Sequence, residues 1–86
     1  MDPNTNQTQE QKSLTFGEKA AGVSFNPSKD PAVDSIKGKF AAVIDEMNAA
    51  RDAATSGGAK RYFAKAISHA EDAQMNAVKA ITWAHE

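Results

Sequence analysis

The run from Ala59 to Glu86 constrains the fold more than any other part of the chain. It contains no Gly or Pro and is rich in Ala, the strongest helix former. Six of its alanines recur at alternating spacings of four and three residues: Ala66, Ala70, Ala73, Ala77, Ala80 and Ala84. Residues at this spacing share one face of a helix. We therefore predict a long helix with a narrow seam of small side chains, which lets a second helix approach closely. Larger residues widen this seam at Phe63, Ile67, Val78 and Ile81.

The length of the chain limits it to one small domain. With 86 residues and no cysteine, it has neither a disulfide nor a thiolate metal site to stabilise a small core. Association between copies is the remaining way to enlarge that core. We therefore expect a homo-oligomer.

The charge balance and the hydropathy exclude two classes of partner. Ten basic and eleven acidic side chains give a formal net charge of −1, without the basic excess of a protein that binds DNA or RNA polymers. No apolar run is long enough to cross a bilayer, and Met1 is followed by polar residues rather than by a signal peptide. We expect a soluble, intracellular protein that partners neither a nucleic acid polymer nor a membrane.

The N-terminal part of the chain divides into two segments of different composition. Residues 1–15 are rich in Asn, Gln and Thr, which predicts a flexible tail ahead of a single domain over residues 16–86. Residues 16–28, FGEKAAGVSFNPS, show no helical period, and Pro27 disfavours helix at the residue before it, so we expect an extended arm. Phe16 and Phe25 either cover the seam of the helices, or one of them lines a pocket as a stacking platform.

A first helix is predicted to begin at Asp30 and Pro31, because Asp suits an N-cap and Pro suits the first helical position. Apolar residues then recur at spacings of three and four, with Ile44 beside them, at Val33, Ile36, Phe40, Val43, Met47, Ala50 and Ala54. The helix should end near Thr55, where Ser56-Gly57-Gly58 offers left-handed residues for a C-cap. Two long helices joined by so short a turn lie antiparallel. The predicted fold is all-α: an antiparallel two-helix hairpin with an N-terminal extended arm, assembled into a homo-oligomer.

The second helix carries a further set of large side chains off the alanine seam: Tyr62, Met75, Val78 and Trp83. A helix cannot pack two faces on one partner helix, so this second face needs another cover. It meets either another copy of the chain or the folded-back arm of residues 16–28.

No enzyme motif, metal site or cofactor site is expected from the sequence. His69 and His85 are sixteen residues apart and do not form a metal-ligand motif. Neither a nucleophile elbow nor a P-loop nor a Rossmann fingerprint is present. The segment Gly57-Gly58-Ala59-Lys60-Arg61 combines helix-start amides with two cations, which either hold a phosphate or only keep the helix soluble.

Three segments, in this order, resemble the small phage hairpin domain shared by the anti-CBASS cyclic-nucleotide sponges and their anti-Thoeris relatives. They are residues 22–37 (GVSFNPSKDPAVDSIK), the glycine-bearing turn with Arg61, and residues 71–83 (EDAQMNAVKAITW), and the resemblance spans residues from about 16 to 84. It implies a helical homo-oligomer, hexameric in known members, that sequesters immune signalling nucleotides without cleaving them in the cytoplasm of the infected bacterial host.

The two branches of this family differ in the ligand that the resemblance implies. The anti-CBASS branch binds cyclic dinucleotides between protomers and cyclic trinucleotides at separate sites. The anti-Thoeris branch captures cyclic ADP-ribose isomers. This short chain is more similar to the anti-CBASS branch, so cyclic di- and trinucleotides are the expected partners.

The candidate ligand-binding residues are Phe25, Asn26, Ser28, Lys37, Lys39 and Arg61. Phe25 is the expected stacking residue, because the two bases of a cyclic dinucleotide stack on aromatic rings. Lys37 matches the family's Ile-Lys position and is the expected phosphate ligand, with Lys39 as its neighbour. The alternative for Lys37 is a solvated helix lysine.

The other candidates have smaller expected roles. Asn26 and Ser28 would read base edges, and Arg61 matches the arginine that the family implies in the trinucleotide site.

The chain departs from the family pattern at two positions. Relatives often have Trp where this chain has Asn76, which affects the interface between copies. They often have an aromatic residue where this chain has Val23, so the stacking residue stays open between Phe25, Phe16 and Tyr62.

Two further functions stay open at this level. One is a helical adaptor that binds another helix through Met75, Val78 and Trp83. The other is a hydrolase of the same signals, although the sequence contains no recognisable metal site or general base for it.

Overall fold

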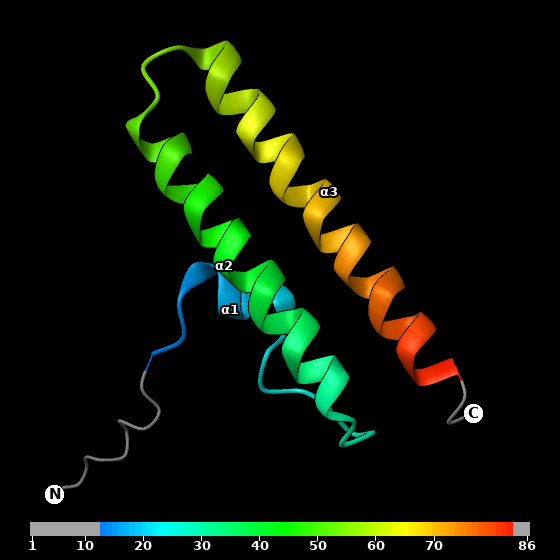
Figure 1. The fold of residues 1–86 in the computed structure, drawn as a ribbon. Coiled ribbons are helices and arrows are strands. Elements are labelled where there is room, and N and C mark those ends of the chain that lie inside the picture. Colours follow the sequence, from blue (N-terminus) through cyan, green and yellow to red (C-terminus); the bar gives the residue numbers. More distant parts are fainter. Residues whose placement is uncertain (1–12, 84–86) are drawn as a thin grey trace, which may run out of the picture.

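A computed structural model describes residues 13–83 of the chain, and three helices account for most of them. They are α1 (Phe16–Ala21), α2 (Pro31–Ala53) and α3 (Gly57–Thr82). Helices α2 and α3 form the predicted antiparallel hairpin, and α1 packs across α2 (Figure 1). The described residues contain no strand, so the all-α class is confirmed. Most of the tail predicted over residues 1–15 lies outside the described residues.

The predicted extended arm is wrong at its beginning, because residues 16–21 form helix α1. Thr15 is the N-cap: its hydroxyl accepts a hydrogen bond from the Glu18 amide at 3.0 Å, and the Glu18 carboxylate accepts one from the Thr15 amide at 2.8 Å. Such a reciprocal capping box starts a helix without any hydrophobic period. Gly22 ends α1 in the left-handed conformation with φ 66°, which costs glycine no steric penalty.

Helix α1 is held against α2 by one carboxylate and one close backbone contact. The Asp45 side chain accepts hydrogen bonds from the Thr15 hydroxyl and from the Gly17 amide, both at 2.7 Å. A Cβ on Gly17 would lie 2.0 Å from the Ala41 carbonyl oxygen, so only glycine fits there. The negative charge of Asp45 also suits the positive end of the α1 dipole.

The predicted start of α2 is confirmed, and the glycine cap predicted for its end is wrong. Asp30 accepts a hydrogen bond from the Ala32 amide at 2.9 Å, and Pro31 is the first helical residue. At the other end, the C-cap Ala54 has extended backbone, and Gly57 and Gly58 belong to α3. The Ser56 hydroxyl caps α3 by accepting a hydrogen bond from the Ala59 amide at 3.0 Å.

The core on α3 coincides only in part with the alanine seam predicted by the sequence. Ile67 and Gln74 are buried, whereas Ala73 and Ala80 are exposed and Ala84 lies outside the described residues. The observed seam keeps the spacing of four and three but is shifted toward the larger residues of the predicted seam, with Gln74 as the one addition: Phe63, Ile67, Ala70, Gln74, Ala77 and Ile81. It includes a polar residue, which a search for apolar periodicity passes over.

Helix α2 is buried along a line that also contains a polar residue. Its buried residues are Val33, Lys37, Ala41 and Ile44, while Val43, which was expected in the seam, is half exposed. The line lies between two neighbours, because α2 contacts both α1 and α3. None of the helices in the described range is long and apolar enough to span a bilayer.

Candidate functional site

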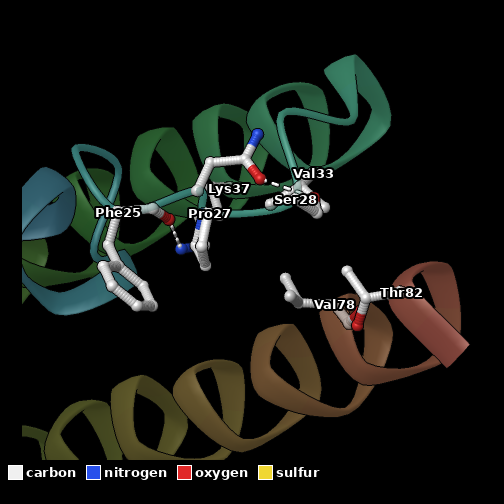
Figure 2. A pocket seen from close by; sticks show the side chains of 8 residues that line it. Phe25, Pro27, Ser28, Val33, Lys37, Val78 and Thr82 are labelled. Atoms are coloured by element: carbon white, nitrogen blue, oxygen red, sulfur yellow. Dashed lines mark hydrogen bonds between the residues drawn. The ribbon is translucent and has the colours of Figure 1, made fainter. Parts of the chain in front are cut away.

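Two adjoining cavities lie where the loop of residues 22–28 meets helices α2 and α3. The first, the loop cavity, has a volume of about 280 Å³ and is lined by Phe25, Asn26, Pro27, Ser28, Val33, Lys37, Val78 and Thr82. The second, the helix cavity, has a volume of about 370 Å³ and is lined by Lys19, Ala20, Ala21, Gly22, Phe25, Lys37, Gln74, Met75 and Val78. Phe25, Lys37 and Val78 line both. Figure 2 shows Val78 and Thr82 on α3 across the loop cavity from the residues of the loop and α2.

Lys37 is the most constrained residue of the site. Only 6% of its surface is exposed, and its Nζ donates hydrogen bonds to the carbonyl oxygens of Gly22, at 2.9 Å, and of Phe25. Both carbonyls belong to the turn that follows α1. Lys37 is therefore not a solvated helix lysine, because its ammonium holds this turn against α2.

Phe25 stands at the mouth of the two cavities. Its side chain is 68% exposed, and its ring centroid lies 5.5 Å from the Lys37 Nζ, within cation–π range. Its backbone amide donates to the Gly22 carbonyl at 3.0 Å, which fixes the turn that carries the ring. An aromatic face and a cation thus lie side by side at this opening.

Asn26 and Ser28 line the loop cavity, and their polar groups hold the loop together. The Asn26 amide nitrogen donates to the Asp30 carbonyl and to the Asp34 carboxylate, both at 3.0 Å. The Ser28 hydroxyl donates to the Asn26 side-chain oxygen at 2.7 Å and accepts from the Asp30 amide at 3.1 Å. These hydrogen bonds give the residues of the segment FNPS a structural role, since they fold it into the turn that leads into α2.

The structure does not bring the other two candidate residues to these cavities. Lys39 is exposed, and its Nζ reaches only the Ser35 hydroxyl, at 3.3 Å. Arg61 lies near the opposite end of α3, where its guanidinium stacks 4.8 Å from the ring of Tyr62. Arg61 precedes Val78 by 17 residues in α3, which is about 25 Å along the helix axis. Neither Lys39 nor Arg61 lines either cavity.

The three candidates for stacking occupy different surroundings. Phe16, which is 43% exposed, lies on α1 with its ring 5.5 Å from the Arg51 guanidinium. Tyr62 pairs with Arg61 at the far end of α3. Phe25 alone among the three lines the two cavities.

Sequence reasoning missed two polar residues of the helix cavity, Lys19 and Gln74. Gln74 lies at the spacing of the observed seam on α3, so it could have been found if the face of α3 that packs on α2 had been known. Lys19 carries no local signal, because it reaches the cavity only through the docking of α1. Among the described residues, no group of three His, Cys, Asp or Glu side chains could hold a metal ion.

Comparison with known proteins places this fold in a family. The family described as "Acb2/Tad1, hairpin domain" matches residues 18–82, which span all of the cavity-lining residues. No curated protein and no solved structure matches the chain. The family match covers most of the chain, including the turn, the Ile-Lys pair and both hairpin helices. The chain therefore belongs to the Acb2/Tad1 hairpin-domain family.

Proposed function

We propose that this protein is a viral sponge that binds cyclic oligonucleotide second messengers without cleaving them. It acts in the cytoplasm of the infected bacterial host and blocks activation of CBASS effectors by lowering the free messenger concentration. Membership of the Acb2/Tad1 hairpin family carries this proposal, because the family suggests a nucleotide-sponge role. Cyclic dinucleotides such as cyclic GMP-AMP are the proposed ligands of the two cavities.

The geometry at the mouth of the cavities supports a nucleotide ligand. Stacking of one base on an exposed aromatic ring contributes about 1–3 kcal/mol, and Phe25 offers such a ring. A lysine ammonium has three N–H donors. The Gly22 and Phe25 carbonyls take two of those on Lys37, which leaves one for a phosphate oxygen.

The exposed apolar residues support a site that is completed by a second copy. Met75 lines the helix cavity yet is 57% exposed, and Trp83 is 67% exposed at the end of α3. Large apolar side chains of this kind are typical anchors of interfaces. We propose that a neighbouring protomer covers this face in a homo-oligomer, as a hexamer, and closes the cavities over the ligand.

Titration calorimetry of the purified full chain with 3′,3′-cyclic GMP-AMP tests the function. We expect saturable binding, with the ligand recovered intact by chromatography after the protein is heat-denatured. A linear dinucleotide of the same bases is the control, and it should bind much more weakly because its phosphates and bases are not held in a ring. A panel of cyclic trinucleotides and cyclic ADP-ribose isomers then separates the anti-CBASS from the anti-Thoeris branch.

Three results would contradict parts of the proposal. The absence of binding to every member of the panel would exclude a sponge. Loss of intact ligand over time would indicate a hydrolase instead. Light scattering gives the number of copies, and a lone monomer with and without ligand would exclude a site shared between protomers.

The exposure of Met75 and Trp83 also fits a second candidate, a helical adaptor whose apolar face binds another helix. An adaptor would stay unchanged on addition of nucleotides. The calorimetric panel therefore distinguishes it from the sponge.

A further inference from the structure

Gln74 is a buried polar residue whose role the fold does not explain. Only 3% of its surface is exposed, and its side-chain amide has no hydrogen-bond partner among the residues that the structure describes. Buried amides are almost always hydrogen-bonded, because an unpaired one loses its bonds to water without replacement. Gln74 also lines the helix cavity, together with Phe25 and Lys37. An unpaired amide in the wall of a cavity indicates a partner that enters the cavity.

The hydrogen-bonding groups of the Gln74 amide indicate which part of a nucleotide ligand would pair with it. A glutamine side chain offers two N–H donors and one carbonyl acceptor next to each other. A phosphate presents only acceptors, so it would leave the Gln74 carbonyl unpaired. Two lysines, Lys19 and Lys37, already line the same cavity, and their ammonium groups are suited to phosphates. The edge of a nucleobase, in contrast, presents a donor and an acceptor side by side.

We propose that Gln74 is a specificity-determining residue that reads the edge of a nucleobase in the helix cavity. This inference rests on the proposed function and goes further, because it assigns base discrimination to a named side chain. Phe25 and Gln74 line the same cavity, so a base stacked on the Phe25 ring lies at the cavity that Gln74 also lines. Adenine and guanine edges differ in the order of their donors and acceptors, so one amide pairs better with one of these bases than with the other.

The test compares Gln74→Leu with the wild-type chain on three ligands of equal charge: cyclic di-AMP, cyclic GMP-AMP and cyclic di-GMP. Leucine keeps the size of the side chain and removes the amide. We expect the wild-type affinities for the three ligands to differ by about tenfold or more, and the variant to lose about tenfold in affinity for the preferred ligand, since two buried hydrogen bonds are lost. The spread among the three ligands should shrink in the variant.

Two controls separate base reading from a purely structural role. Asn48→Leu removes the same group on α2, at a residue that lines neither cavity and whose side-chain oxygen accepts a hydrogen bond from the Arg51 guanidinium. It should leave the ratios between ligands unchanged. Thermal melting followed by circular dichroism should show Gln74→Leu at or above the wild-type Tm, since an unpaired buried amide is replaced by an apolar group. If the leucine variant does not fold, Gln74→Met removes the amide with a more adaptable side chain.

The inference is overturned if the folded Gln74 variant retains the wild-type ratios of affinity. It is also overturned if the wild-type chain binds all three ligands equally well, in which case the proposed sponge function still stands. No binding by the wild-type chain to any cyclic nucleotide would overturn both the sponge function and the role of Gln74.

Discussion

Lys37 combines a structural and a proposed ligand-binding role in one side chain. Its ammonium is buried and holds two carbonyls of the turn after α1, and the same group lines both cavities. A hydrogen bond to a charged group contributes about 1.5–3 kcal/mol to stability. The contribution of Lys37 to the stability of the fold can therefore be measured in the absence of any ligand.

Replacing Lys37 by Met should lower the free energy of unfolding by about 1.5–3 kcal/mol, because the Gly22 and Phe25 carbonyls lose their shared donor. Urea denaturation of the ligand-free protein measures this change. Lys39→Met is the matched control: its ammonium is exposed and reaches only Ser35, so the change should stay within about 0.5 kcal/mol. Equal effects of the two substitutions would show that the buried contacts of Lys37 do not stabilise the turn.

Replacing Phe25 by Ala should weaken binding of cyclic GMP-AMP by about 1–3 kcal/mol, the value of stacking one base on an aromatic ring. The fold should change little, since this ring is largely exposed. Phe16→Ala and Tyr62→Ala are the comparisons, because both rings lie away from the cavities, and calorimetry on the three variants ranks them. A larger loss in either comparison variant would assign the stacking role to that residue.

Asn26 and Ser28 were expected from the sequence to bind the edges of bases, and their residue types explain this expectation. Asn and Ser beside an aromatic residue and a Pro suggest either a binding loop or a turn that bonds to itself. The structure shows that both side chains bond within the loop. Sequence alone cannot decide between these uses, because they require the same residue types.

At the scale of elements, the docking of α1 on α2 depends on a position where no side chain fits. Gly17 brings the α1 backbone against the Ala41 carbonyl, and Asp45 binds the first turn of α1. Through this contact α1 supplies one wall of the helix cavity, with Lys19, Ala20 and Ala21.

Replacing Gly17 by Ala should lower the free energy of unfolding by about 1–3 kcal/mol, the usual cost of forcing an extra methyl group into a filled space. Gly38→Ala is the matched control in α2. No atom lies within 4 Å of the added Cβ there, and the residue is helical. That substitution should stabilise the protein by about 0.5–1 kcal/mol. Urea denaturation of both variants measures the two effects, and a destabilisation shared by both would contradict this account of Gly17.

The hairpin was predictable because its signals are local and repeated. The N-cap at Asp30, the Pro that follows it and the apolar spacing along both helices agree with one another. Helix α1 was not predicted, since its evidence is a four-residue capping box, Thr15 to Glu18, rather than a period. The α3 seam was misplaced in part, because two of the regularly spaced alanines, Ala73 and Ala80, are exposed, whereas the polar Gln74 is buried.

At the scale of the whole molecule, the candidate residues separate into two regions at opposite ends of the hairpin (Figure 1). The cavities lie beside the loop of residues 22–28 and the C-terminal half of α3, whereas Arg61 lies near the turn between α2 and α3. Lys19, Phe25, Lys37 and Gln74 come together only through tertiary packing. No spacing in the sequence predicts that grouping.

Together with the proposed trinucleotide role of Arg61, this separation predicts two independent ligand sites. Arg61→Ala should leave the affinity for cyclic dinucleotides within about threefold of wild type, since a surface charge about 25 Å away along the helix is largely screened. Lys65→Ala, which removes another exposed cation of α3, is the control for a general loss of charge. The affinity for cyclic trinucleotides, measured by calorimetry, should fall in Arg61→Ala and not in Lys65→Ala. A parallel loss for both ligand classes would contradict two separate sites.

The way in which α1 is fastened has a consequence for interpreting any variant of this protein. Local unfolding often releases a small peripheral segment at a lower free energy than the whole fold. Helix α1 has only six residues, beside helices of 23 and 26 residues, and supplies one wall of the helix cavity. Detachment of α1 would therefore remove the cavity wall while the far-ultraviolet spectrum stayed almost unchanged. Amide hydrogen exchange at Gly17 to Ala21 would show whether α1 is docked and the cavity wall is intact. The total helix content would not show this.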